Sequence, residues 1–263
     1  MKTTEEYIKS EKIFICSGIP PGICFSEDTA INRWSHCSPR YSGIKRFNEK
    51  DILHDFEQYA PVHAIHYDFM AEREKVLADM QQYGIPTRLL DWTFAPLNAL
   101  FFACSSNEDK DGEIIVFNPW KYNQFVIGDE EKPEAHHIHV LCRALLSGGW
   151  NPEEAIDFVR EKYNFKNFDA DGLRYPFAFI ANYTNNRIFH QRGCYTIQGT
   201  SNIPLDEVSI AGECLLRIEV SQHYKKSILK ELNQLYINHY SIFPDFEGMK
   251  NMILQNRGLF NAE

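Results

Sequence analysis

The stretch Met80–Thr93 constrains the fold of this chain more than any other segment. Gly84 can adopt the left-handed backbone conformation that commonly ends a helix, and Pro86 prevents that helix from continuing. A second helix, apolar along nearly its whole length, is expected over residues 96–104 and should be buried. Between the two helices lies a cluster of polar and charged side chains: Thr87, Arg88, Asp91 and Thr93. Such a cluster is either a buried structural network or a functional site.

This polar cluster has two interpretations. In the first, Arg88 and Asp91 form a buried ion pair that fixes the turn while Trp92 packs in the core, because buried charges must be paired. In the second, Arg88 and Thr87 bind a phosphate group and an aromatic side chain lies against a base or sugar. The planar guanidinium group suits such phosphate contacts. The residue pattern leaves both interpretations open.

The composition narrows the class of protein. The 263 residues carry a formal net charge of −9, which argues against sequence-independent nucleic-acid binding because that needs a basic surface. Seven cysteines, with no pair at CxxC spacing, fit reduced cytosolic thiols better than a disulfide framework. The sequence shows no signal-peptide pattern and no apolar run of about 20 residues, so we expect a soluble cytoplasmic protein without a membrane segment.

Local patterns predict helices and strands. Asn48 should cap a helix over 49–59. Apolar residues at helical spacing from Ile65 to Tyr83 predict a second helix, whose opposite side, with Asp79, should be exposed to water. Further helices are expected at 134–147, from Asn151 to Tyr163, and at 184–191, 224–235 and 248–255. Strands are expected at 13–16, 113–117, 177–180, 194–197 and 215–220, whereas 118–133 looks irregular.

These elements predict a single α+β domain over residues 1–263, with core motifs at about 20–250. We expect a mixed or antiparallel sheet, built from the central and C-terminal half and packed with N-terminal and C-terminal helices. Strands concentrate between residues 113 and 220, and 134–164 is interpreted as a helical insertion. Cys104 and Cys194 lie in apolar runs and should be inert core thiols.

Three further groups are candidates for chemistry. Arg187 and Gln191 share one side of a predicted helix, which either lines a cleft or is an ordinary solvated surface. Asp245 and Glu247 form a candidate acid pair, although a capping role before the last helix fits better. In the short cluster His136, His137 and His139, only His136 and His139 have the spacing of a helical metal-binding pair. No third ligand is evident for that pair, so no metal site is predicted.

The segment QQYGIPTRLLDWTFAPLNALFFAC resembles the core motif of FRG-domain proteins, QHYG-PTRLLDWT-NPL-AL-FA. Two later segments resemble the same family: Asn186–Tyr195 is similar to its N-R-I-x-x-Q-x-G-x-F run, and Ile242–Gly248 to its L-F-P-D-L-D-G run. The family is named for an N-terminal Phe-Arg-Gly or Tyr-Arg-Gly. By spacing, the matching place here is Phe25-Ser26-Glu27, which lacks the arginine and the glycine.

The resemblance implies a bacterial or phage-related protein and leaves two functions open. The first is an enzyme that handles a nucleotide, most plausibly NAD, because the Arg-bearing start of the family looks like the first strand of ADP-ribosyltransferases. The catalytic candidates are then Arg88 and Gln191, and the substrate-binding candidates are Thr87, Asp91, Trp92, Asn186, Arg187 and Tyr195. The second is a non-catalytic binding module for a protein partner in phage defence or stress response, which the missing arginine favours.

Overall fold

Within the residues that the structure describes, the strands form one six-stranded sheet in the order β4-β5-β2-β1-β3-β6, and every neighbouring pair is antiparallel. The computed structural model describes residues 14–17, 49–63, 67–68, 72–128, 156–157, 160–161, 168, 171–180, 183–201 and 203–258. The strands are β1 (Phe14–Ser17), β2 (Leu89–Thr93), β3 (Gly112–Phe117), β4 (Phe177–Phe179), β5 (Gly193–Ile197) and β6 (Leu215–Val220). The predicted α+β class is therefore confirmed, and of the two sheet types considered the antiparallel one is present.

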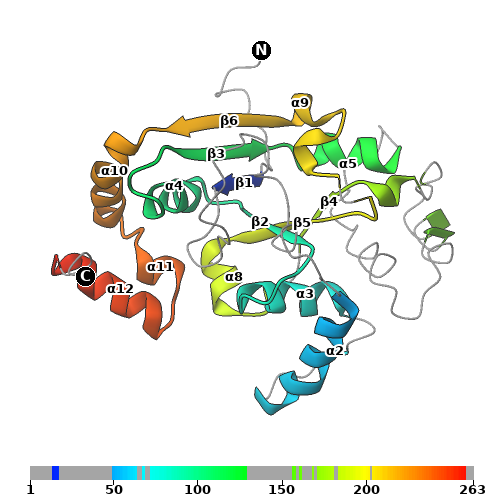
Figure 1. Ribbon diagram of the computed structural model, residues 1–263, viewed down its shortest axis with the longest axis horizontal. Coiled ribbons are helices and arrows are strands. Elements are labelled where there is room, and N and C mark those ends of the chain that lie inside the picture. The colour runs from blue at the N-terminus through cyan, green and yellow to red at the C-terminus, as the bar shows by residue number, and fades with distance from the viewer. Residues whose placement is uncertain are drawn as a thin grey trace.

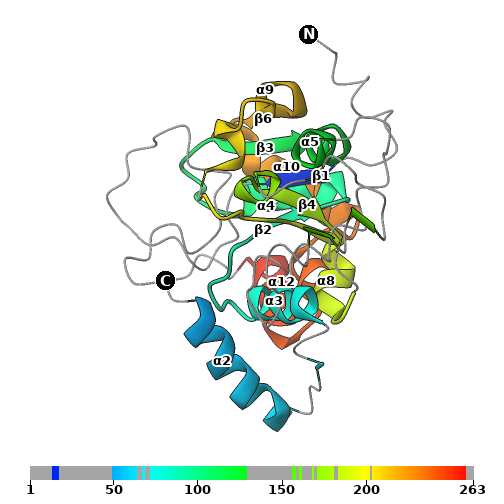
Figure 2. The ribbon, with the colours of Figure 1, turned by 90° about the vertical axis from the view of Figure 1, so that its right-hand side faces the viewer.

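Helices cover the sheet and extend beyond one end of it (Figures 1 and 2). The α-helices are α2 (Glu49–Tyr59), α3 (Arg73–Gln82), α4 (Pro96–Ser105), α5 (Pro119–Ile127), α8 (Asn186–Gln191), α9 (Ala211–Cys214), α10 (Gln222–Gln234), α11 (His239–Ile242) and α12 (Phe246–Asn256). Short 3-10 turns occupy Ala60–His63, Gly172–Arg174 and Leu205–Glu207. Helix α4 packs against β1 and β3, α10 packs on α4, and α3 and α8 contact β2 and β5.

The central strand β2 presents different chemistry to its two faces because successive side chains point to opposite sides. Trp92 points into the larger core cluster, where its ring lies 5.0 Å from that of Phe117. Asp91 alternates with Trp92 and so faces the other side, toward α3. Strand β5 continues this arrangement, since Tyr195 lies directly opposite Asp91 in the register. The polar part of the motif is thus held on the α3 face of the sheet.

Strand β2 is the main element that local pattern did not predict, because no strand was expected between residues 26 and 112. Leu89–Thr93 carries a charged residue in the middle of the sheet, and that obscures the strand pattern. Its hydrogen-bonding partners are β1 and β5, which come from distant parts of the sequence. The strand is therefore fixed by long-range pairing rather than by propensity.

Helix α3 is shorter and more buried than the sequence suggested. It begins at Arg73, and Tyr67 and Asp68 are not helical, so one continuous helix from Ile65 to Tyr83 is wrong. The Glu72 carboxylate accepts the Asp68 N–H at 3.0 Å and organises a turn before the helix. The prediction that the opposite side of this helix is exposed to water is also wrong, because Arg73 and Asp79 are both buried and hydrogen-bonded.

Helix α5 occupies most of the segment that was expected to be irregular. Its local signals are all present: Asn118 caps the first turn by accepting the Lys121 N–H, Pro119 stands at the first position, and Gly128 ends the helix with φ 72°. Its buried Asn123 exchanges two hydrogen bonds with the backbone of Ala178 in β4. The prediction of an irregular segment is therefore wrong for Pro119–Ile127, where these local caps favour a helix.

The remaining predicted elements are confirmed where the structure describes them. Helices α2, α4, α8, α10 and α12 and strands β1, β3, β4, β5 and β6 lie at the predicted places, within a few residues at their ends. The predicted helix 134–147, the Asn48 cap and His136, His137 and His139 lie outside the described residues. The thiols of Cys104 and Cys194 are buried as expected, and burial raises the pKa of Cys104. Within the described ranges, no helix is both long and apolar enough to cross a bilayer.

Candidate functional site

The turn between α3 and β2 is braced by a chain of side-chain hydrogen bonds. Gly84 takes a positive φ of 81° directly after the helix, as expected for a residue that ends it. The buried Thr87 hydroxyl donates to Gln81 Oε1 at 2.8 Å, and Gln81 Nε2 donates to Asp91 Oδ2 at 2.7 Å. The Leu89 N–H in turn donates to Thr87 Oγ1 at 3.1 Å. These bonds tie α3, the turn and β2 into one unit.

Arg88 forms its ion pair with a distant helix rather than with Asp91. Its Nε donates to Glu49 Oε2 at 2.7 Å, and Glu49 is the first residue of α2. Only about a tenth of the Glu49 side chain is exposed, against a fifth of the Arg88 side chain. The predicted Arg88–Asp91 pair is therefore wrong, because Asp91 faces α3 and accepts from Gln81 instead. Trp92 does pack in the core, where its Nε1 donates to Thr196 Oγ1 at 3.1 Å.

Asp91 and Tyr195 face one another across β2 and β5. Tyr195 is fully buried, and its ring stacks on Phe179 with centroids 5.7 Å apart. Burial, followed by the nearby charge of Asp91, raises the pKa of Tyr195 well above its ordinary value. The phenol therefore stays protonated at neutral pH and acts as a neutral core group.

Arg187 joins all three segments that resemble the FRG family. It lies in α8, its Nη1 donates to the Gln82 carbonyl at 3.1 Å, and its Nε donates to Asp245 Oδ2 at 2.9 Å. The guanidinium group also lies over the Phe243 ring, 5.2 Å from the centroid. Asp245 in turn caps α12 by accepting the Gly248 N–H at 2.9 Å. The capping role predicted for Asp245 is confirmed.

The electrostatics of Asp245 follow from these contacts. Burial acts to raise the pKa of its carboxyl group, but the Gly248 amide and the Arg187 guanidinium outweigh it and hold the pKa below its ordinary value. The carboxylate is thus charged at neutral pH. The Arg187 side chain is about a third exposed, so this pair lies at the edge of the network and in reach of solvent.

The other α8 candidates separate in space. The Gln191 side chain donates to the Ile242 carbonyl of α11 at 3.4 Å, and the Gln191 carbonyl accepts from the Thr93 hydroxyl at 2.6 Å. Asn186 is exposed at the start of the helix, whereas its neighbour Asn185 is the cap. Asn185 also donates to Asp79 Oδ1 at 2.6 Å.

A buried carboxylate at Asp79 completes the α3 face and was missed at the sequence level. It accepts hydrogen bonds from Tyr67 at 2.8 Å and from Thr184 and Asn185 at 2.6 Å each. Burial and the bond to Asp79 raise the pKa of Tyr67 far above its ordinary value. The Asn185 cap before α8 was a readable sequence signal, but its partner more than a hundred residues away was not.

The candidate residues fall into three places. Thr87, Asp91 and Tyr195 share the α3 face of the sheet, and Arg187 reaches its edge through the Gln82 carbonyl. The Arg88 side chain bonds to α2 and the Gln191 side chain bonds to α11, so these two candidates have their partners on different helices. The motif as observed is a network of internal contacts.

Comparison with known families agrees with the first of the three motifs. A family model for the FRG domain matches residues 25–112, which run from Phe25 through α2, α3, β2 and α4 to the start of β3. This part of the chain is therefore similar to an FRG domain. The segments Asn186–Tyr195 and Ile242–Gly248 lie outside the matched range, and their resemblance stays a prediction. Neither a curated protein nor a solved structure matches the chain.

Proposed function

We propose that this protein is a non-catalytic binding module, of the kind that bacteria use in phage defence or stress response, and that its FRG motif braces the fold. The observation that carries the proposal is the position of Arg187. This one side chain bonds to the end of α3 and to the cap of α12 while it sits in α8. Three segments far apart in sequence are thereby fixed to one another, which is what a rigid binding scaffold needs.

The burial of the motif supports this proposal. Thr87 and Tyr195 are fully buried, Trp92 is nearly so, and Arg88 is bound to a carboxylate. Groups bonded in this way would need their present partners removed before they could bind a substrate, and that costs free energy. The missing family arginine supports it as well. Position 26, which matches the family arginine by spacing, is a serine. The first strand of the sheet, β1, also carries no arginine and ends at Ser17.

A nucleotide-handling function, with NAD as its ligand, is the second candidate, and one observation favours it. Arg187 is partly exposed, lies over the Phe243 ring and is next to the exposed Asn186. A phosphate could compete with Asp245 for the guanidinium group while an aromatic ring stacks on a base. On this function Arg88 and Gln191 would remain the catalytic candidates.

Thermal melting with a panel that includes NAD, ADP-ribose, ATP and GTP separates the two functions. A ligand that binds the native state must raise the melting temperature. We expect no shift with any nucleotide and no cleavage of NAD. A shift with NAD that is lost in Arg187→Lys, with Lys250→Arg on the exposed side of α12 as the control, would reject the binding-module proposal in favour of the nucleotide function.

A further inference from the structure

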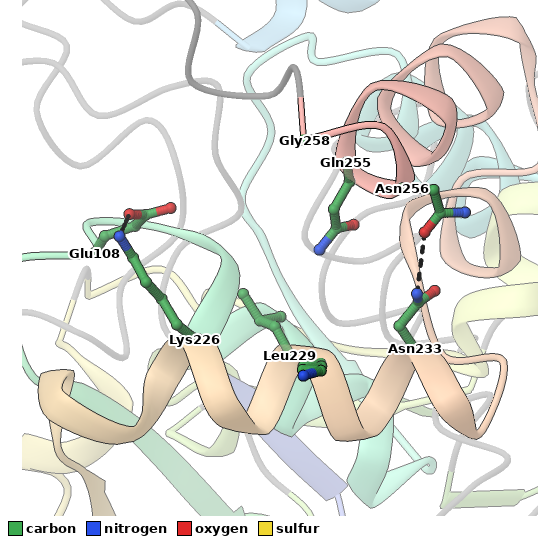
Figure 3. A pocket seen from close by; sticks show the side chains of 8 residues that line it. Glu108, Lys226, Leu229, Asn233, Gln255, Asn256 and Gly258 are labelled. Atoms are coloured by element: carbon green, nitrogen blue, oxygen red, sulfur yellow. Dashed lines mark hydrogen bonds and ion pairs between the residues drawn. The ribbon is translucent and has the colours of Figure 1, made fainter.

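A groove whose lining includes charged and amide side chains lies between α10, α12 and the turn after α4 (Figure 3). Its volume is about 350 Å³, which is within the range of ligand-binding pockets. The groove is open to solvent along one side. Its lining comprises Glu108, Lys226, Leu229, Lys230, Asn233, Gln255, Asn256 and Gly258.

The charged side chains of this groove favour an anionic ligand. At one end Lys226 pairs with Glu108 at 3.1 Å, which leaves that end close to neutral. Lys230, one turn further along α10, makes no ion pair with any carboxylate in the described part of the chain. The groove thus offers an exposed, uncompensated ammonium group on a protein whose formal net charge is −9. A local positive site of this kind selects for carboxylates by charge complementarity.

The amide side chains favour a ligand with alternating donors and acceptors. The Asn233 side-chain amide donates a hydrogen bond to Asn256 Oδ1 at 3.1 Å. Asn233 in turn accepts one from the Asn238 side chain, also at 3.1 Å. Gln255 points into the groove beside them (Figure 3). Its Oε1 is buried and has no hydrogen-bond partner among the described residues. An acceptor left without a partner beside the groove favours a ligand that brings an N–H or O–H donor.

We propose that this groove binds an acidic peptide segment in extended conformation, supplied by a partner protein. Backbone N–H and C=O groups of the peptide pair with the amides of Gln255 and Asn256, and a peptide carboxylate pairs with Lys230. Leu229 gives the floor an apolar contact for a small side chain. No aromatic ring is present in the described lining, so the groove lacks the stacking surface that a nucleobase would use. This inference rests on the proposed binding function and names the class of partner.

The test is fluorescence anisotropy of the full chain with a short fluorescein-labelled peptide in which Glu and Ala alternate. The matched probe replaces each Glu by Gln. We expect binding of the acidic probe only, with affinity that falls as salt is added because exposed charges are screened. Lys230→Glu should weaken binding at least about tenfold. Gln255→Leu should weaken it too, whereas Lys250→Glu, the same charge change on α12 outside the groove, should have little effect.

Several outcomes would overturn the inference. Equal binding of the acidic and neutral probes would do so, as would equal effects of Lys230→Glu and Lys250→Glu. The groove would instead be a small-anion site if inorganic phosphate displaced the acidic peptide at the concentration at which phosphate itself binds, and if the acidic and neutral probes bound equally well. Failure of the peptide to bind leaves the wider binding-module proposal intact as long as the nucleotide panel gives no Arg187-dependent shift. The two proposals therefore fail on separate measurements.

Discussion

Arg187 and Asp245 stand 58 residues apart in sequence, and the Nε and Nη2 atoms of the arginine contact Oδ2 of the aspartate at 2.9 and 2.8 Å. The same aspartate caps α12 through its other oxygen. One carboxylate therefore fixes both the start of a helix and the position of a second helix. This arrangement gives a physical role to two segments that resemble the FRG family.

The two roles of Asp245 can be separated by substitution. Asp245→Ala removes the cap and the ion pair and should lower the free energy of unfolding by about 1–2 kcal/mol, mostly through the cap. Asp245→Asn keeps a capping oxygen and should cost less. The coupling energy between Arg187 and Asp245 in a double-mutant cycle should be below about 1 kcal/mol, because both side chains are more than a third exposed. Urea unfolding measures all three values, and a coupling of several kcal/mol would contradict the exposed-pair interpretation.

Thr87 should be required for stability because its hydroxyl group is both a donor and an acceptor. Thr87→Val removes the bond to Gln81 Oε1 and leaves the Leu89 N–H without its acceptor, in a fully buried place. We expect a loss of about 1–3 kcal/mol in the free energy of unfolding. Thr87→Ser keeps the hydroxyl and is the control. If denaturant midpoints for the Val and Ser variants coincide, the hydroxyl network does not brace the turn.

Gly248 should not tolerate a side chain. An alanine Cβ at this position would lie 1.9 Å from the Phe243 carbonyl oxygen and 2.9 Å from that of His239, so backbone must move. We expect Gly248→Ala to lower the melting temperature by several degrees, which corresponds to more than about 1 kcal/mol. Gly212→Ala is the matched control, since a Cβ there meets nothing within 4 Å. Equal melting temperatures for the two variants would show that the α11–α12 turn adapts freely.

Stability should fall on mild acidification because of His239. Burial lowers its pKa below the ordinary value of 6.5, and its ring packs edge-on against Phe101 with centroids 5.1 Å apart. Below about pH 6.5 the unfolded chain binds a proton that the folded chain resists, so the free energy of unfolding decreases as pH falls. Above that pH both states are neutral and the effect disappears. His239→Gln should flatten the pH dependence of the denaturation midpoint between about pH 7 and 5; an unchanged slope would mean that His239 titrates normally.

Elements with local signals could be predicted from the sequence. The Pro96 start of α4, the Asp245 cap of α12 and the alternation along β6 each depend on residues within one turn or a few positions, and these elements form where expected. Helix α5 belongs with them, because its Asn118 cap and its Gly128 end are local signals as well. The FRG resemblance at residues 81–104 falls inside the segment that the family model matches.

Tertiary structure alone decided which side chains meet. Arg88 could have paired with its neighbour Asp91, but strand β2 turns Asp91 toward α3, where it accepts from Gln81. Arg88 therefore pairs with Glu49, which lies 39 residues earlier in the sequence. Strand alternation is only defined once β2 has paired with β1 and β5, and no local pattern encodes that pairing. The sequence by itself determined the polar residue types, several helix ends and the resemblance to the FRG domain. Sheet register and helix packing then determined whether each charge became part of a brace or stayed available to a partner.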